Sequence, residues 1–224
     1  MNFQLKPAVR QLSLAFPLLL IALPAVLKAA DDKPGVALPP PSLYDSPGQT
    51  GAPPSFTAII VRALAALLLE HSYLNATLED HTVLLHHRAH IGVAIDRAGD
   101  LLAPVLRDAQ LLSLAETSAA LRDLHVRAHA HTLSQAELRG STFTVSNLGM
   151  HGVDSFTAII NPPESAILAV GRIAEMPVAR NGAVVVRPIM QLTLSADHRI
   201  VDGAAAARFL AALRERLEEP YLLI

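Results

Sequence analysis

The pattern of apolar and polar positions predicts four helices. Residues 55–70 are apolar nearly all round a helix and begin with a serine that can cap it, which is typical of a buried helix. Residues 113–130 are amphipathic, and Ser113 with Glu116 three residues later has the spacing of a capping box. Two further helices are expected, a short one at 134–138 and a last one at 203–217.

Alternating or β-branched apolar runs predict strands between these helices. The runs lie at 83–85, 91–95, 141–149, 167–170, 184–186 and 189–194, and a turn is expected at Gly99–Asp100. Because helices and strands interleave without a strict βαβ repeat, we expect an α/β fold. Its mixed sheet would be covered on one face by helices, in a two-layer sandwich.

The first 54 residues follow another pattern. Lys6 and Arg10 precede an apolar run at 12–27, and small residues follow it, which is typical of a secretory signal peptide. The alternative is a wrongly chosen start codon, or upstream sequence fused to a truncated gene. The next segment is rich in proline and glycine, so we expect an extended linker there rather than helix or sheet. The predicted organisation is an apolar leader at 1–30, a linker at 31–54 and a folded domain at 55–224.

Composition narrows the classes of function. Hydrophobic residues make up 51% of the 224, which is enough for a sizeable core, and only 17% are charged. The net charge of −2 gives no electrostatic footprint for nucleic acid. The chain has no cysteine, which excludes disulfides, thiolate metal sites and a cysteine nucleophile.

His198 lies in the connection between a predicted strand and the last predicted helix. Loops at strand ends often display catalytic side chains, and the usual pKa of histidine, about 6.5, suits a base near neutral pH. Asp197 and Asp202 could orient the imidazole or balance its charge, and Gly203 allows a tight turn into the helix. The alternative is a surface histidine that only caps or hydrogen-bonds locally.

Seven other histidines raise the question of a metal site, at positions 81, 86, 87, 90, 125, 129 and 131. His86 and His87 would face opposite sides of a strand, and His125 with His129 forms an isolated pair on a helix, without a third ligand. We therefore expect solvated histidines and no metal. Separately, two large apolar residues are expected to pack along a channel or core, Met150 and Phe156.

The stretch "LSADHRIVDGAAAARFL" around His198 resembles the histidine motif of the acyltransferase (E2) components of 2-oxo-acid dehydrogenase complexes. The resemblance continues through residues 90–124 and 141–173 and covers 55–224 in order, up to the C-terminal "LEEPYLLI". A looser form of the motif belongs to the chloramphenicol acetyltransferase-like superfamily. The resemblance implies a CoA-dependent acyltransferase fold.

The family resemblance implies a chemistry for three residues. The histidine that matches His198 is a general base, which removes the proton from the thiol of coenzyme A or dihydrolipoamide as its sulfur attacks a thioester. The serine that matches Ser146, in "TVSNLG", stabilises the oxyanion of the tetrahedral intermediate, and the residue that matches Asp202 helps to hold the site. For Ser146, the alternative is a turn residue bonded to its own backbone. Two further motif positions are expected to have structural roles, Asp197 and Arg199.

The family also implies assembly and partners. Its catalytic domains form homotrimers, in which the histidine of one subunit faces the serine of the next. Trimers join into larger cores with the help of an apolar tail such as "YLLI". Coenzyme A would be a substrate, the lipoyl group would be supplied in trans by another chain, and E1 and E3 components would be candidate partners. We expect no nucleic-acid partner, and a membrane contact only if the leader is an uncleaved anchor.

The sequence departs from the family pattern at its front. The lipoyl and peripheral-subunit-binding domains have no counterpart, and neither does the arginine-containing helix that normally begins the catalytic domain. We therefore expect a domain that is shortened at its N-terminus, in which Asp202 lacks the arginine that can pair with it in the family. Two alternatives to the E2-like acyltransferase stay open, a non-catalytic scaffold and a small-molecule acetyltransferase of the same superfamily. Because CoA thioesters are cytoplasmic, we favour the cytoplasm over export or membrane anchoring through residues 1–30.

Overall fold

The computed structural model describes residues 54–97, 99–180 and 182–219, and the backbone of three short strands before them. These strands are β1 (Leu5–Lys6), β2 (Val9–Ser13) and β3 (Val36–Ala37). The rest of the predicted leader and linker and the tail "YLLI" lie outside the described residues. The expectation that the linker forms no sheet is wrong at β3, which pairs with the main sheet. Neither residue of β3 is a proline, so both keep the backbone N–H that a sheet uses.

The α-helices begin where the sequence supplies a capping side chain. The Ser55 hydroxyl accepts a hydrogen bond from the Ala58 N–H, and Ser113 forms the predicted capping box with Glu116. The α-helices are α1 (Phe56–Glu70), α2 (Leu114–His129) and α3 (Gly203–Glu218). The 3-10 helices are η2 (Ser72–Leu74), η3 (Ala109–Leu111), η4 (Gln135–Leu138) and η5 (Gly149–His151). In the described part of the chain, no helix is long and apolar enough to cross a membrane.

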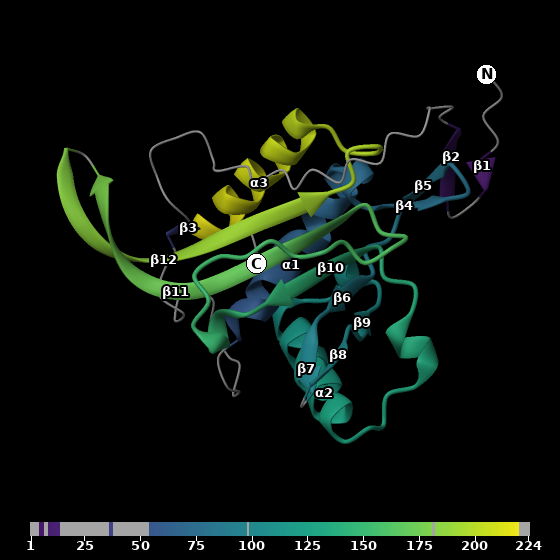
Figure 1. Cartoon of the computed structure of the whole chain (residues 1–224), viewed down its shortest axis with the longest axis horizontal. Helices are drawn as coiled ribbons and strands as arrows, with labels where there is room; N and C mark the ends of the chain where they lie inside the picture. The colour runs from purple at the N-terminus through teal and green to yellow at the C-terminus, as the bar shows by residue number, and fades with distance from the viewer. Residues whose placement is uncertain are drawn as a thin grey trace.

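The main sheet has six strands in the order β3-β12-β11-β10-β6-β9 (Figure 1). Besides β3, they are β6 (Ile91–Val93), β9 (Val105–Leu106), β10 (Phe143–Asn147), β11 (Ala166–Arg180) and β12 (Ala183–Ala196). β10 is parallel to β11 and β6, whereas the other pairs are antiparallel, so the predicted mixed sheet is confirmed. The three runs predicted between 167 and 194 are parts of only two long strands.

Two smaller sheets complete the strands. β5 (Thr82–His86) pairs with β2 and with β4 (Ala76–Glu79), and β7 (Ile95–Arg97) pairs with β8 (Asp100–Leu102). The strand predicted at 91–95 is therefore divided between β6 and β7. β4 was not predicted, and its turn into β5 places Asp80 and His81 at positive φ.

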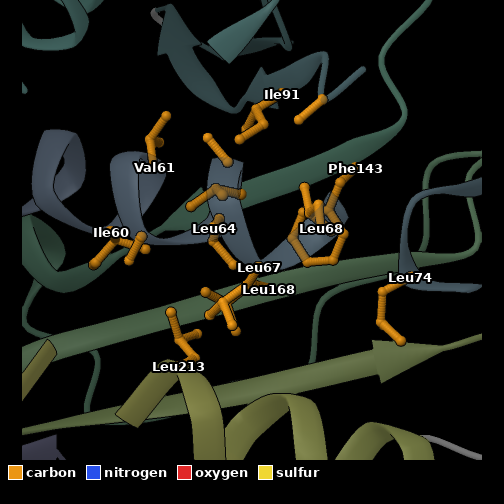
Figure 2. Close-up of a cluster of buried hydrophobic side chains, with 14 of the residues drawn as sticks. Ile60, Val61, Leu64, Leu67, Leu68, Leu74, Ile91, Phe143, Leu168 and Leu213 are labelled. Carbon is orange, nitrogen blue, oxygen red and sulfur yellow. The ribbon is translucent and has the colours of Figure 1, made fainter. Parts of the chain in front are cut away.

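One main core lies between the sheet and the helices (Figure 2). α1 is buried on most sides, as its sequence predicts, and contacts both α2 and α3. Alternate residues of the strands point into this core, among them Phe143 and Val145 of β10 and Leu168 of β11. The intervening residues of β10, Thr144 and Ser146, therefore face the other side of the sheet, away from the helices.

β11 and β12 continue past the core as a curved two-stranded ribbon (Figure 1). The ribbon begins where the pairing register shifts between Val170 and Ile173. On one of its faces, beyond the first pair Ile173 and Met190, every residue is exposed and all but one are apolar: Glu175, Pro177, Ala179, Val184, Val186 and Pro188. Val184 alone is 76% exposed. An apolar face of this length is typical of a surface that contacts another protein chain.

Candidate active site

Ser146 lies near the carboxyl end of β10, on the sheet face opposite to the helices. Its backbone pairs with Ala169 of β11 in a parallel register, and its side chain is half-buried. It belongs to the strand rather than to the polar turn that follows. A hydroxyl on a strand is held in a fixed direction, which suits a hydrogen-bond donor to a developing charge.

The loop after Ser146 packs tightly against β11. The Arg172 N–H donates a hydrogen bond of 2.7 Å to the Val153 carbonyl, at the point where the register of β11 shifts. A Cβ on Gly171 would lie 1.9 Å from the Asp154 carbonyl oxygen, so only glycine fits there. Arg172 Nε and Asp154 Oδ1 are 2.5 Å apart. These contacts fix the loop on the strand.

His198 lies on an exposed turn directly after β12. Asp197, the residue before it, donates its N–H to the Ser165 carbonyl at 2.8 Å, and its carboxylate forms a 2.5 Å ion pair with Arg199 Nη2. Burial opposes the ionisation of Asp197, but the hydrogen bonds from Arg199 outweigh burial and hold its pKa below the usual value. Asp197 and Arg199 thus shape the turn, and the imidazole stays open to solvent.

Asp202 lies four residues after His198 and is the N-cap of α3. Its Oδ1 accepts a hydrogen bond of 2.7 Å from the Ala205 N–H. Within one chain, the carboxylates of Asp202 and Asp197 therefore bond to groups other than the imidazole. Asp202 places the histidine turn relative to the helix that follows it.

Ser146 and His198 do not meet within one chain. Ser146 pairs with Ala169 of β11, which in turn pairs with Thr193 of β12. From Thr193 the chain continues along β12 to Asp197, the residue before His198, which bonds to the Ser165 carbonyl just before β11. Asp197 lies four residues, each of about 3.3 Å, along β12 from Thr193, and Thr193 lies two strand spacings of about 4.8 Å from Ser146. These two displacements are at right angles, so Asp197 is roughly 16 Å from Ser146. The predicted base and the predicted oxyanion donor thus lie at opposite ends of the paired strands.

Glu164 is a buried acid that the sequence reasoning missed. It is 3% exposed and precedes β11. Its Oε1 accepts hydrogen bonds from Ser141, from Thr144 at 2.9 Å and from Asn161 at 2.9 Å, while Oε2 has no partner among the described residues. Burial raises the pKa of this carboxyl, and the three hydrogen bonds only partly counteract that effect. The sequence signal that could have revealed it is an acidic residue placed two positions before the apolar run of β11.

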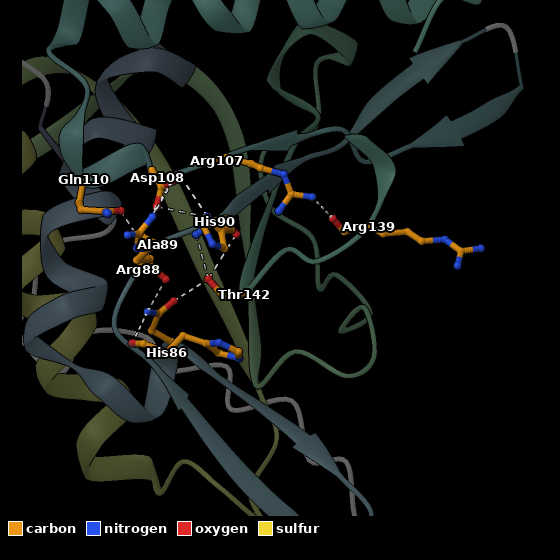
Figure 3. Close-up of polar contacts among 10 residues, drawn as sticks. His86, Arg88, Ala89, His90, Arg107, Asp108, Gln110, Arg139 and Thr142 are labelled. Carbon is orange, nitrogen blue, oxygen red and sulfur yellow. Dashed lines mark hydrogen bonds and ion pairs between the residues drawn. The ribbon is translucent and has the colours of Figure 1, made fainter. Parts of the chain in front are cut away.

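Two of the histidines expected to be solvated are partly buried and hydrogen-bonded, so that expectation is wrong for them. His86 Nε2 lies 3.0 Å from Thr77 Oγ1. His90 Nδ1 accepts the Asp108 N–H at 3.0 Å (Figure 3). Burial lowers the pKa of both rings, because the side chains of His86, at the end of β5, and His90, just before β6, are partly buried. Over the residues that the structure describes, no group of three or more histidines or acids could hold a metal ion.

Met150 does not pack into the core of the single chain, one of the two places that the sequence predicts for it. It lies on η5, just after the Ser146 strand, and is 82% exposed in the single chain. Phe156, in the following loop, is half-buried.

Comparisons with known sequences agree with this architecture. The model of the family described as 2-oxoacid dehydrogenases acyltransferase (catalytic domain) matches residues 43–224. The dihydrolipoyllysine-residue acetyltransferase component of the pyruvate dehydrogenase complex of Rickettsia felis is 38% identical over 170 residues, which are 76% of this chain and 41% of that protein. The dihydrolipoyllysine-residue succinyltransferase component of the 2-oxoglutarate dehydrogenase complex of Azotobacter vinelandii is 39% identical over 75% of this chain and 42% of its own length. The chain thus spans about two fifths of these relatives.

Solved structures give the same family. A probable dihydrolipoamide acetyltransferase from Listeria monocytogenes is 34% identical, with a TM-score of 0.73 over 76% of this chain and 73% of that one. The Azotobacter vinelandii dihydrolipoamide acetyltransferase, also 34% identical, has a TM-score of 0.74 over 77% of this chain and 72% of that one. It was studied for the role of a serine, a histidine and an asparagine in its catalytic mechanism. Chloramphenicol acetyltransferase, 15% identical with a TM-score of 0.50, shares the fold alone. The predicted resemblance and fold class are confirmed.

Proposed function

Because the chain belongs to the family of 2-oxoacid dehydrogenase acyltransferase catalytic domains, we propose that it moves an acyl group between coenzyme A and dihydrolipoamide. One spacing carries the proposal. In the Azotobacter vinelandii enzyme, the serine lies 52 positions before the histidine and the asparagine lies four positions after it. Here Ser146 lies 52 positions before His198, and Asp202 lies four positions after it. We infer the same three functional positions, with aspartate in place of asparagine.

The proposed mechanism uses His198 as the base. A thiol with a pKa near 8.5 keeps its proton at neutral pH, so its attack on a thioester needs a positioned base. A ring nitrogen of His198 takes the thiol proton as the sulfur bonds to the carbonyl carbon. The carbonyl oxygen becomes an oxyanion, which accepts a hydrogen bond from the Ser146 hydroxyl; one such donor contributes about 3 kcal/mol to the transition state. Collapse of this intermediate breaks the older C–S bond, and His198 returns the proton to the departing thiolate.

A site shared between two copies of the chain fits this mechanism. The base and the oxyanion donor must both come within about 3 Å of the reacting groups, whereas the backbone of Asp197, next to His198, lies roughly 16 Å from that of Ser146 in one chain. The exposed apolar face of the β11–β12 ribbon supports self-association. We infer a homotrimer-based assembly in which His198 of one copy meets Ser146 of the next. One solved relative is the cubic core of the pyruvate dehydrogenase multienzyme complex.

The remaining partners follow from the proposed chemistry. The lipoyl group would reach the site on another chain, and E1 and E3 components would act before and after it. Coenzyme A would bind as a substrate, and the mechanism needs no metal ion. Because CoA thioesters are cytoplasmic, we propose a cytoplasmic location, with export or anchoring through residues 1–30 as the alternative.

Acyl transfer to free dihydrolipoamide tests the proposal. Acetyl-, propionyl- and isobutyryl-CoA are compared as donors, because the acyl preference depends on the shape of the channel. Turnover by the wild type that collapses in His198→Ala is the expected result. A folded wild-type protein without turnover would overturn the proposal and favour the scaffold, whereas transfer to small-molecule acceptors alone would favour the broader acetyltransferase class.

Complementation tests the shared site. Ser146→Ala and His198→Ala are each expected to be nearly inactive alone. When the two are co-expressed, roughly a quarter of the interfaces of a cyclic assembly combine an intact serine with an intact histidine, so a similar fraction of activity should return. Co-expressed variants that stay as inactive as either parent would refute the shared site.

A further inference from the structure

Asn147 follows Ser146 on β10 and points to the opposite face of the sheet, toward the helices. Its Nδ2 donates a hydrogen bond of 3.0 Å to Thr57 Oγ1, in the first turn of α1. Its Oδ1 accepts a hydrogen bond of 2.9 Å from the Gly149 N–H. One side chain thereby connects the end of β10 to a helix and to the loop that follows.

The end of β10 is paired on one side only. β6 pairs with β10 as far as Val145, and the Ala94 N–H makes the last backbone hydrogen bond from that side, at 2.9 Å to the Val145 carbonyl. Within the described strands, Ser146 and Asn147 then pair with β11 alone. The bond from Asn147 to Thr57 lies where the support from β6 has ended. It restrains the strand end from the helix side.

The neighbouring loop packs closely against Asn147. A Cβ on Gly149 would lie 3.0 Å from the Gly171 carbonyl oxygen and 3.1 Å from Asn147 Oδ1. Closely packed groups of this kind move together rather than singly. A strand end released from Thr57 would therefore shift together with the loop, and Ser146 would shift with it.

We propose that Asn147 and Thr57 form a positioning pair that fixes the Ser146 hydroxyl for oxyanion stabilisation. This inference rests on the proposed acyltransferase function. An oxyanion donor acts within about 2.7–3.1 Å of the developing charge, and a misplacement of about 1 Å can cost on the order of 100-fold in rate. The pair contacts no reacting group and acts through Ser146.

Substitutions at Thr57 test the pair. Thr57→Val keeps the shape of the side chain and removes the hydroxyl, whereas Thr57→Ser keeps the hydroxyl. Thr57→Val should lower kcat about tenfold or more, with less than about a twofold change in the KM for coenzyme A, and Thr57→Ser should restore kcat. Thr77→Val is the matched control, since it removes a hydroxyl that contacts His86 Nε2 at 3.0 Å, on β4 and away from Ser146. Its kcat should equal that of the wild type.

The Ser146→Ala background separates positioning from a general structural effect. If Thr57 acts through the Ser146 hydroxyl, Thr57→Val should lower the residual rate of Ser146→Ala by less than about twofold. The same fold loss in both backgrounds would overturn the positioning role. So would a Thr57→Val variant with the wild-type kcat.

Amide hydrogen exchange tests the pair without turnover. Thr57→Val should speed exchange at the Gly149 amide, which bonds to Asn147, and at the Leu148 amide, which donates to the Val170 carbonyl at 3.1 Å. Thr77→Val should leave both unchanged. Unchanged exchange in Thr57→Val would overturn the pair even in an active enzyme. If Thr57→Val exchanges faster than the wild type but the wild type shows no acyl transfer, the proposed function is refuted and the contact between Asn147 and Thr57 is supported.

Discussion

Gly171→Ala tests the close packing of the loop behind Ser146. The added Cβ would lie 1.9 Å from the Asp154 carbonyl oxygen, whereas ordinary contact begins at 3.4 Å. The obstacle is backbone, so no side-chain rotation can relieve it. The loop must move by about 1.5 Å, which separates the Arg172 N–H from the Val153 carbonyl.

The cost can be estimated from these two effects. Forcing a methyl group into a well-packed site typically costs about 1–3 kcal/mol, and the lost hydrogen bond costs about 1 kcal/mol. Gly171→Ala should therefore lower the free energy of unfolding by about 2–4 kcal/mol. For a domain of this size, that corresponds to a fall in Tm of roughly 5–15 °C.

Urea denaturation followed by far-ultraviolet circular dichroism measures this loss, since the chain has no tryptophan to report by fluorescence. The protein concentration must be equal for all variants, because self-association shifts apparent stability. Gly203→Ala is the control, since a Cβ at this first residue of α3 meets open space and alanine favours helix. A Gly171→Ala protein within about 0.5 kcal/mol of the wild type would show that the loop is not fixed on β11.

Three further predictions follow from the polar contacts. Asp202→Ala should lower the free energy of unfolding by about 1 kcal/mol, because α3 loses its N-cap. Asp202→Asn should keep most of the stability that the cap provides. Equal losses for the two variants in urea denaturation would contradict the capping role. The pKa of Glu164 is raised in the folded state, so the unfolded chain loses that proton first as pH rises, and stability should fall as pH rises from about 4.5 through the folded pKa. Glu164→Gln should remove this slope, and a stability difference from the wild type that is flat between about pH 4.5 and 8 would contradict it. Hydrogen bonds from the Ser134 hydroxyl and N–H, and then from Arg127, lower the pKa of Glu137 to about 2. Its stabilising contribution is therefore present above about pH 4.5 and lost as pH falls through about 2. In an NMR titration Ser134→Ala should raise that midpoint, and an unchanged midpoint would contradict the assignment.

The predictable parts of the fold are those that neighbouring residues determine. The capping box of Ser113 and Glu116 locates the start of α2 because both partners lie within one helical turn. The all-round apolar segment after Ser55 predicts a buried α1 for the same local reason. The mixed sheet follows more generally from the interleaving of helices and strands.

The long strands could not be predicted from local pattern. The distal half of β11 carries Glu175 and Pro177, and the distal half of β12 carries Pro188, which are residues that usually argue against a strand. They are accommodated because, beyond the pairing of β12 with β3 at Ile189 and Met190, the described ribbon has only two strands, and a missing N–H at an outer edge costs little. The two strands form a hairpin, in which Ala179 pairs with Val184 near the turn and Val170 pairs with Leu192 nearer the core. The local pattern does not show the register shift between Val170 and Ile173.

The residues of the proposed site can be named from the sequence, but their arrangement cannot be predicted from it. The motif around His198 indicates the base, and the family resemblance indicates Ser146. The partners of the two aspartates are local in sequence, because Asp202 caps α3 through the Ala205 N–H and Asp197 pairs with Arg199 within the same turn. The distance from His198 to Ser146 depends on sheet register, which local sequence does not encode.

Because Ser146 and His198 lie at opposite ends of the paired strands, we expect dilution of the protein to lower its activity. If base and oxyanion donor come from different copies, a lone chain holds two half-sites and no whole one. Specific activity should then fall as the protein is diluted below the dissociation constant of its assembly, although no bond within any chain has changed. A newly synthesised copy would stay inactive until it associates with other copies. The rate at which the cell synthesises the protein would therefore determine when turnover begins.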